Sequence, residues 1–364
     1  MIQLRVALLG DIALIGRYDR TRSGQVSERL RSVKSILDTC DEVVANLESP
    51  LTAKTTTTTC KGIHLRSDPA NVETLRYLNV TAVNLANNHL HDYGFQGMRD
   101  TIAVLEKNGI RYFGINNGIC FIENGGAGIA LDGFCCYSSN GVNYGAKYGQ
   151  IAVLSERNVE RSLSAIGEKG FYGIVSAHFG DENIHYPRVD HISLFRRLSR
   201  EYHFTLHGHH PHVIQGIERV NGSLLAYSLG NLIFDNVASM AIRNLHYEQT
   251  GENKESAIVI LEVSAYGLAG CQTIPLNDVS SGIIPHDETV AGKLRLYSET
   301  LNVGLEECRS LRDKEVLDLQ KRIVPKRDLR FLMNRLSYYY IGAYLNGRRN
   351  ARTYRSLFHG STGV

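Results

Sequence analysis

Residue types suited to metal chemistry are concentrated in the segment His207-Gly208-His209-His210-Pro211-His212, where four of six residues are histidines. At neutral pH these imidazoles are mostly uncharged and are good ligands for a borderline divalent ion. A metal centre needs further ligands, and the sequence supplies them at one recurring kind of position. Apolar stretches with strand character end in polar residues able to bind metal, namely Asp11, Glu48, Asn88, His178 and the histidine segment itself.

Such a set suits a centre of two metal ions. A pair about 3.5–4 Å apart, bridged by a carboxylate, can activate water and hold both the attacking and the leaving oxygens of an ester. His89 follows Asn88 directly and could protonate the leaving oxygen. Any one of these residues alone is more simply a turn or a structural residue, and their joint occurrence favours a site. The predicted metal ligands are Asp11, Glu48, Asn88, His178, His210 and His212.

These residues require a scaffold that gathers strand ends. Strands that alternate with helices predict an α/β fold, in which sites lie at the carboxyl ends of the strands. Residues 110–150, rich in Gly, Asn and Tyr, predict strands and loops. The predicted strands are 4–9, 43–48, 80–85, 173–178, 204–206, 224–229 and 257–263, and the predicted helices are 25–38, 69–78, 98–107, 156–168 and 190–201.

Bulk properties narrow the class of protein. The 364 residues carry a net charge of +3, too small to indicate a nucleic-acid partner for the whole chain. The seven cysteines form no C-x-x-C pair and are typical of reduced thiols in the cytoplasm. The amino-terminal apolar run is too short for a signal peptide, and no stretch approaches the ~18 apolar residues of a membrane span. We therefore expect a cytoplasmic protein, with peripheral membrane association as an alternative.

The chain changes character past about residue 286. We predict a main domain over 1–285 and a helical, basic extension over 286–364. The simplest interpretation is a solvated helix packed on the core by its Tyr and Leu residues, and the alternatives are contact with an anionic polymer, a membrane surface or nucleic acid. The extension contains Lys321-Arg322, Lys326-Arg327, Arg330, Arg335, Arg348-Arg349, Arg352 and Arg355, with Asp328 as the one acid among them.

The order of these motifs resembles the CapA (poly-γ-glutamate/capsule biosynthesis) proteins of the calcineurin-like metallophosphoesterase superfamily. The resemblance covers roughly residues 4 to 265 and leaves the extension out. It implies a four-layer α/β/β/α sandwich with two mixed sheets. The matching stretches are Gly10-Asp11, Asn46-Leu47-Glu48-Ser49-Pro50, Asn84 to Gly94, Ala177 to Glu182, Gly208 to Glu218 and Tyr227 to Asn231.

The resemblance also implies roles for individual residues. Asp11 and His212 would bind the first metal, Glu48 would bridge, and His89 would be the general acid. The second metal would take Asn88, His178 and His210. One departure is at position 13, because Asp11-Ile12-Ala13 stands where the wider superfamily has D-x-H. Two divalent ions are expected, and Mn, Fe or Zn suits the mixed imidazole, carboxylate and amide ligands equally.

Other polar residues near these motifs are candidates for supporting roles. Arg17 could pair with an anionic group of a substrate, because a planar guanidinium suits phosphate or carboxylate. His209 is interpreted as a substrate or supporting contact or as a bystander, and His207 as structural. Asp92 and Glu182 could orient ligating imidazoles.

Three functions fit these observations. The first is metal-dependent hydrolysis of a phosphoester or phosphodiester, on an anionic small molecule or polymer. The second is assembly or export of an anionic polymer without turnover, with polymer-biosynthesis or membrane partners. The third is hydrolysis of an amide or another ester by the same activated water. Fold resemblance alone does not choose among them.

Overall fold

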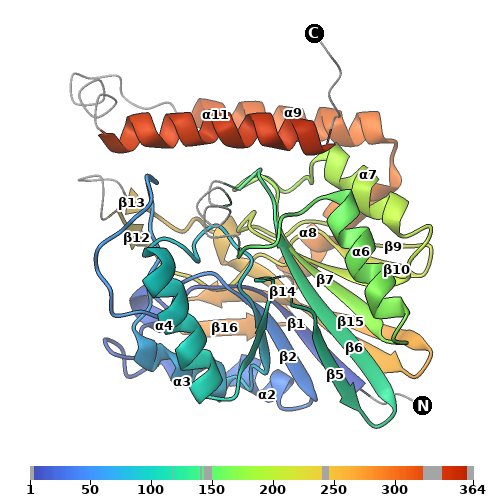
Figure 1. Ribbon diagram of the computed structural model, residues 1–364, viewed down its shortest axis with the longest axis horizontal. Coiled ribbons are helices and arrows are strands. Elements are labelled where there is room, and N and C mark those ends of the chain that lie inside the picture. Colours follow the sequence, from blue (N-terminus) through green and yellow to red (C-terminus); the bar gives the residue numbers. More distant parts are fainter. Residues whose placement is uncertain are drawn as a thin grey trace.

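The computed structural model describes residues 4–116, 118–139, 142, 150–239, 246–322 and 338–358. Two mixed sheets dominate the fold (Figure 1). The first sheet has the order β16-β15-β14-β1-β2-β3-β4, with β11 also pairing with β1. Its strands are β1 (Leu4–Ile12), β2 (Glu42–Leu47), β3 (Ala82–Asn84), β4 (Arg111–Phe113), β11 (Asn231–Ile233), β14 (Glu255–Ser264), β15 (Gly267–Val279) and β16 (Gly282–Pro285).

The second sheet has the order β5-β6-β7-β8-β10-β9, with β6, β7, β8 and β10 parallel to one another. A separate hairpin pairs β12 (Val237–Ala238) with β13 (His246–Tyr247). The strands of the second sheet are β5 (Cys120–Asn124), β6 (Ala127–Cys135), β7 (Tyr172–His178), β8 (Phe204–His209), β9 (Ile217–Val220) and β10 (Ser223–Ala226).

Helices cover the outer faces of both sheets. The first sheet is flanked by α1 (Val26–Arg29), α2 (Arg31–Leu37), α3 (Val72–Tyr77) and α4 (Gly94–Lys107), whose apolar residues share one core with it. The second sheet is flanked by α6 (Glu156–Gly167) and α7 (Val189–Leu198). The α/β fold expected from the alternation of strands and helices is thereby confirmed.

Strand β1 shows why the layers form. Its side chains alternate, so that Leu4 and Val6 lie in the core between the sheets, whereas Ala7 and Leu9 lie in the core under the helices. This period of two follows from the pleat of a strand and gives the sheet two apolar faces. The three cores, one between each pair of neighbouring layers, confirm the four-layer α/β/β/α sandwich.

Several predicted boundaries were wrong in detail. The single helix predicted over 25–38 is two helices, separated at Leu30, whose φ of −100° and ψ of 2° lie outside the helical region. The strand predicted over 224–229 ends at Ala226. Strand β1 continues one residue past Asp11, because that part of it pairs with both β2 and β11.

Three further helices follow the sandwich. Helix α8 (Glu288–Glu299) buries Val290 and Leu294 in the core between the sheets. Helices α9 (Leu305–Arg322) and α11 (Tyr338–Phe358) run across one side of the molecule (Figure 1), which confirms a helical extension. The division into domains at residue 285 stays a prediction. Lys326-Arg327, Asp328, Arg330 and Arg335 lie outside the described residues.

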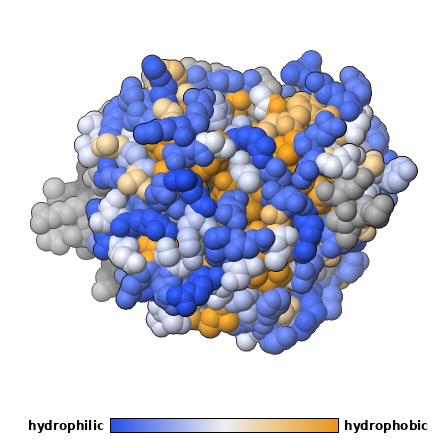
Figure 2. All heavy atoms as spheres, turned by 90° about the horizontal axis from the view of Figure 1, so that it is seen from below, coloured by the Kyte–Doolittle hydropathy of each residue, from blue (hydrophilic) through white to orange (hydrophobic). Residues whose placement is uncertain are grey.

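Figure 2 views the face of the molecule that lies opposite α9 and α11. Figure 2 shows mostly hydrophilic residues there, with hydrophobic ones visible between them. Among the helices that the structure describes, we find none with the length and apolar content needed to cross a bilayer.

Candidate metal centre

The predicted ligands converge at the carboxyl ends of the strands. Asp11 lies in β1 and His178 is the last residue of β7. Glu48 follows β2 directly, Asn88 lies in the loop after β3, and the two remaining histidines follow β8. All six are buried, with exposed fractions of 6% or less. Two sets of three place ligand atoms within 4.8 Å of one another: Asp11, His178 and His209, and Glu48, His210 and His212.

Glu48 occupies the middle of this cluster. Its Oε1 lies 3.6 Å from His212 Nε2 and 3.8 Å from His178 Nε2. The side chain is fully buried, and neither of its oxygens has a hydrogen-bond partner. A buried carboxylate without donors carries a large desolvation cost unless a cation compensates it. The orphaned oxygens of Glu48 therefore fit a divalent ion, and their position among the imidazoles fits a bridging ligand.

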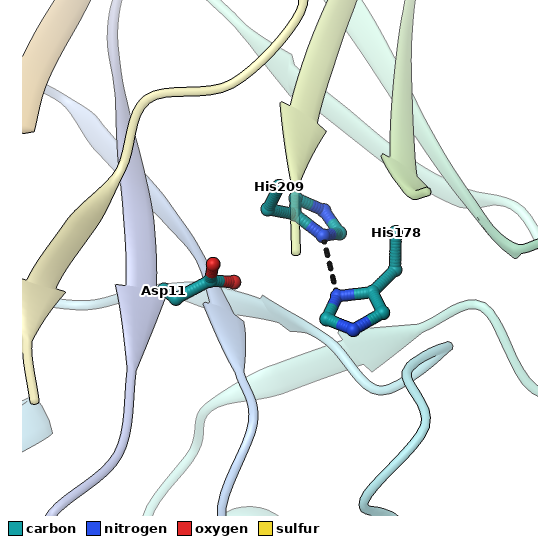
Figure 3. Close-up of side chains that lie close together, drawn as sticks. All are labelled: Asp11, His178 and His209. Atoms are coloured by element: carbon teal, nitrogen blue, oxygen red, sulfur yellow. Dashed lines mark hydrogen bonds between the residues drawn. The ribbon is translucent and has the colours of Figure 1, made fainter. Parts of the chain in front are cut away.

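The ring of His178 is held by residues on the side that faces away from Glu48. Its Nε2 lies 2.9 Å from Asn88 Oδ1, on the side of Glu48. Its Nδ1 lies 3.1 Å from His209 Nδ1 and 3.3 Å from Asn46 Nδ2. Figure 3 shows the His178 and His209 rings joined in this way, with the carboxylate of Asp11 nearby. Nε2 is therefore the nitrogen of His178 that faces the cluster.

His209 was interpreted as a substrate or supporting contact or as a bystander, and the structure places it directly next to His178. Its side chain is fully buried between His178 and the ring of His207, whose centroid is 5.2 Å away. The His207 ring lies 2.8 Å from Ser176 Oγ and 2.6 Å from the carbonyl oxygen of Leu9, as a structural residue would. The contacts of His209 are those of a residue that positions His178.

The loop after β8 is strained where it carries ligands. His210 and His212 have φ values of 101° and 59°, which non-glycine residues seldom adopt. The backbone N–H of His210 donates to Asp11 Oδ2 at 3.1 Å, and its ring Nδ1 has no hydrogen-bond partner. Such strain persists only where the surrounding structure enforces it, and it is common at functional sites.

His212 has partners on both sides of its ring. Nδ1 lies 2.9 Å from Asn231 Oδ1 and 3.6 Å from Asp11 Oδ2, which leaves Nε2 for the space next to Glu48. Burial opposes a charge on this imidazole, but the carboxylates of Glu48 and Asp11 outweigh burial and raise its pKa to about 9. Burial also raises the pKa of both carboxyl groups. Without a metal, a proton on His212 takes the place of a cation.

His89 is held in an arrangement suited to proton transfer. Its Nδ1 donates to Asp92 Oδ2 at 2.6 Å, and its Nε2 lies 3.8 Å from Glu48 Oε1. Lys61 Nζ donates to Asp92 Oδ1 at 2.8 Å and to the carbonyl oxygen of Asn88 at 2.7 Å. Burial, and then the charge of Lys61, lower the pKa of His89 to about 4. Asp92 therefore orients the predicted general acid His89, whereas the sequence had suggested that it orients a metal-ligating imidazole.

Three positions that the sequence pointed to lie outside the cluster. Arg17, in the short helix Gly16–Tyr18, forms an ion pair with Asp278 and donates to the carbonyl oxygen of Val279. Glu182 is exposed, and its charge acts on Glu48 and His212 only through space. Ala13 is fully buried in an apolar cluster with Leu65 and Phe234.

Sequence reasoning missed three buried polar residues. Lys61 lies shortly after the run of threonines at 55–59, and it approaches His89 only through the fold. Asn46 donates to Asp11 Oδ1 at 2.7 Å, and Asn231 orients His212. Both asparagines lie in stretches that carried the family resemblance, which was the signal that could have found them.

The fold and the site define a class of protein: a four-layer α/β/β/α sandwich with a buried carboxylate, amide and imidazole cluster that could hold divalent metal. The chain belongs to the family described as bacterial capsule synthesis protein PGA_cap, whose model matches residues 5–236. The resemblance to CapA proteins is thereby confirmed.

The chain is similar to two CapA proteins and, at low identity, to solved structures. The chain is 33% identical over 245 residues to the PGA biosynthesis protein CapA of Bacillus subtilis, a match that covers 64% of this chain and 63% of that protein. It is 24% identical over 312 residues to the capsule biosynthesis protein CapA of Bacillus anthracis, covering 82% and 72%. The chain thus spans less than two thirds of the length of the Bacillus subtilis relative. A calcineurin-like phosphoesterase of Bacillus subtilis aligns with a TM-score of 0.39 and 12% identity, covering 87% of this chain and 99% of that one.

Proposed function

We propose that this protein is a metal-dependent hydrolase that cleaves a phosphoester or phosphodiester during the biosynthesis of a capsule or another anionic polymer. The observation that carries the proposal is the carboxylate of Glu48, which is buried without a donor among three imidazoles. The family and its capsule-related relatives support the biological setting.

Two divalent ions would be held by the six residues that the resemblance implies. Glu48 would bridge, with Asp11 and His212 on one side and the amide of Asn88 with His178 and His210 on the other. Divalent ions bound there would lower the pKa of a water molecule and polarise a phosphoryl oxygen. Asn46, His209 and Asn231 keep the ligands in place by contacting the atoms that face away from the cluster.

His89 would supply the proton to the leaving oxygen. Asp92 accepts from Nδ1, so the transferable proton is the one on Nε2, the atom that faces Glu48. With a pKa of about 4, His89 is neutral in the free protein at neutral pH. A bound phosphate ester brings negative charge next to Nε2, which favours the protonated imidazolium. Proton donation is thereby coupled to the presence of an anionic substrate.

The test is hydrolysis of bis(p-nitrophenyl) phosphate by protein loaded with Mn²⁺, together with metal analysis. We expect His89→Asn to lower kcat by about 10²- to 10⁴-fold with unchanged metal content, the usual contribution of general acid catalysis. Glu48→Gln should lose both activity and metal. His203→Asn, which removes an exposed imidazole, is the matched control. Metal-replete protein that is inert on a panel of phosphate monoesters and diesters would refute the proposal.

A second function is favoured by one observation. Ala13 takes the place of a ligand and is packed among apolar side chains, so that the first metal has fewer protein ligands. This supports a role in binding or assembling an anionic polymer without turnover. Saturable binding of poly-γ-glutamate by metal-loaded protein, with no phosphoesterase activity and no shortening of the polymer, is the result that favours this alternative.

A further inference from the structure

Helix α11 packs against the sandwich by one side only. Asn350 and Tyr354, one helical turn apart, are 2% and 5% exposed. Tyr354 Oη donates to Asp190 Oδ2 at 2.6 Å and lies 3.0 Å from His191 Nε2. At the other end, a Cβ added at Gly342 would lie 2.8 Å from Cys60, so the helix also touches the loop that carries Lys61. These contacts fix which side of α11 faces outward.

The outward side has an uneven composition along the helix. Its first half exposes Ile341, Tyr344 and Leu345 by 48%, 62% and 60%. Its second half exposes four arginines, and the helix contains no acidic residue. Residues three and four positions apart share a helix face, so the apolar and basic side chains form one continuous strip, which we call the α11 outer face. The four arginines are Arg348, Arg349, Arg352 and Arg355.

We infer that the α11 outer face docks on an anionic lipid surface. Guanidinium groups pair with anionic headgroups, and the apolar side chains enter the boundary between headgroups and acyl chains. A soluble polyanion would satisfy the arginines but would leave Ile341, Tyr344 and Leu345 in water. Only a surface that is both anionic and apolar matches the whole strip.

The strip of exposed apolar and basic side chains is specific to α11, as a comparison with the neighbouring helix α9 shows. Helix α9 carries five acidic and five basic residues, so its charges balance. It exposes Leu317 by 56%. The basic residues around Leu317 on this helix are accompanied by acidic ones, so they form no purely basic cluster beside it. Three of its basic side chains pair with carboxylates: Arg309 with Glu306, Arg312 with Asp181 and Lys321 with Asp318. Docking through α11 would place the membrane on the side of the molecule that α9 and α11 form in Figure 1.

The experiment is co-sedimentation of the full chain with vesicles of phosphatidylcholine and phosphatidylglycerol, and with vesicles of phosphatidylcholine alone. We expect binding to the anionic vesicles only, falling as salt is added. The double variant Arg348→Gln/Arg352→Gln should weaken vesicle binding by on the order of tenfold or more, because each basic residue near an anionic surface adds a severalfold gain in affinity. Arg157→Gln/Arg161→Gln, two exposed arginines at the same spacing on α6, should leave it unchanged.

The apolar half is tested separately. Leu345→Ser should weaken vesicle binding several-fold, whereas Leu317→Ser on α9, with a similar exposed fraction, should not. The inference would be overturned by no preference for anionic vesicles, by equal losses in the control variants, or by self-association through α11 that Leu345→Ser abolishes. Binding of soluble poly-γ-glutamate that is insensitive to Leu345→Ser, without vesicle binding, would overturn it in favour of a polymer. Because sedimentation needs no turnover, failure here is distinct from failure of the proposed hydrolase.

Discussion

Asp92 holds His89 by the nitrogen that points away from the cluster, with 2.6 Å between the Asp92 Oδ2 and His89 Nδ1 atoms. The same carboxylate pairs with Lys61, whose side chain is 7% exposed. Although burial alone would raise it, Lys61 and His89 hold the pKa of Asp92 well below its usual range. The charge on Asp92 is therefore stable at all ordinary pH values, and so is the orientation of His89.

This arrangement predicts a coupling between Lys61 and Asp92. Lys61→Met should lower the free energy of unfolding by about 3–5 kcal/mol, because it leaves a buried carboxylate without its cation. Adding Asp92→Asn should restore part of that loss, since no charge is then left alone. Urea denaturation measures both effects. Arg76→Met, which breaks the exposed pair with Glu73, is the control and should cost at most about 1 kcal/mol. Strictly additive effects at Lys61 and Asp92 would contradict the coupling.

Metal binding should compete with a proton on His212. With a pKa of about 9, this imidazole is protonated in the metal-free protein at neutral pH and must lose its proton to bind an ion. The apparent affinity for Mn²⁺ should therefore rise by about tenfold per pH unit as the pH approaches about 9. Calorimetry in buffers of different ionisation enthalpy should detect the released proton. An affinity that does not change with pH below that value would show that His212 is not a ligand.

Gly208 should tolerate no side chain. A Cβ at this position would lie 2.0 Å from the carbonyl oxygen of Tyr227. Gly208→Ala must therefore displace the segment that directly follows β10, next to the loop that carries His210 and His212. We expect a loss of about 1–3 kcal/mol in the free energy of unfolding, as for other overpacked sites, and weaker metal binding. Gly167→Ala, where an added Cβ meets nothing within 4 Å, is the control and should not destabilise. Wild-type thermal stability of Gly208→Ala would contradict the geometry.

Asp132 should make the protein less stable as the pH rises. Burial raises its pKa from 3.8 to about 6, so the folded chain binds more protons than the unfolded chain between these values. The free energy of unfolding therefore falls across this window, by up to roughly 3 kcal/mol for a shift of this size. Asp132→Asn should be more stable than the wild type at pH above about 6 and equal to it near pH 4. A difference that is the same at both pH values would mean that Asp132 keeps its ordinary pKa.

The parts of the site that could be predicted from sequence are those that strand ends position. Asp11, Glu48 and His178 each follow an apolar run, and parallel strands bring such ends to one edge of a sheet. Lys61 gave no comparable signal, because its loop has no periodic pattern and its partners lie 27 to 31 residues away. Side-chain direction could not be predicted either. The sequence therefore left open whether His209 is a substrate contact, a supporting contact or a bystander, and only the structure places it behind His178.

The partner of Arg17 could not be predicted from the sequence either. Its position just past the first ligand predicted a contact with an anionic substrate, but β15 brings Asp278 to its guanidinium. The partner is 261 residues away, and only the order of strands in the first sheet places it there. The architecture followed from apolar periodicity, whereas the pairing of charges depended on strand order, which no local pattern contains.

If the donor-free carboxylate of Glu48 binds metal as proposed, the survival of each copy of this protein would depend on the metal supply of the cell. Whatever binds the folded chain and not the unfolded chain adds to its stability by mass action. A copy that folds during metal shortage would lack this added stability, so it would open more often and be cleaved sooner by proteases that act on open forms. Metal starvation would thus deplete the protein itself as well as its activity, and abundance would report metal status before any product of the pathway changed.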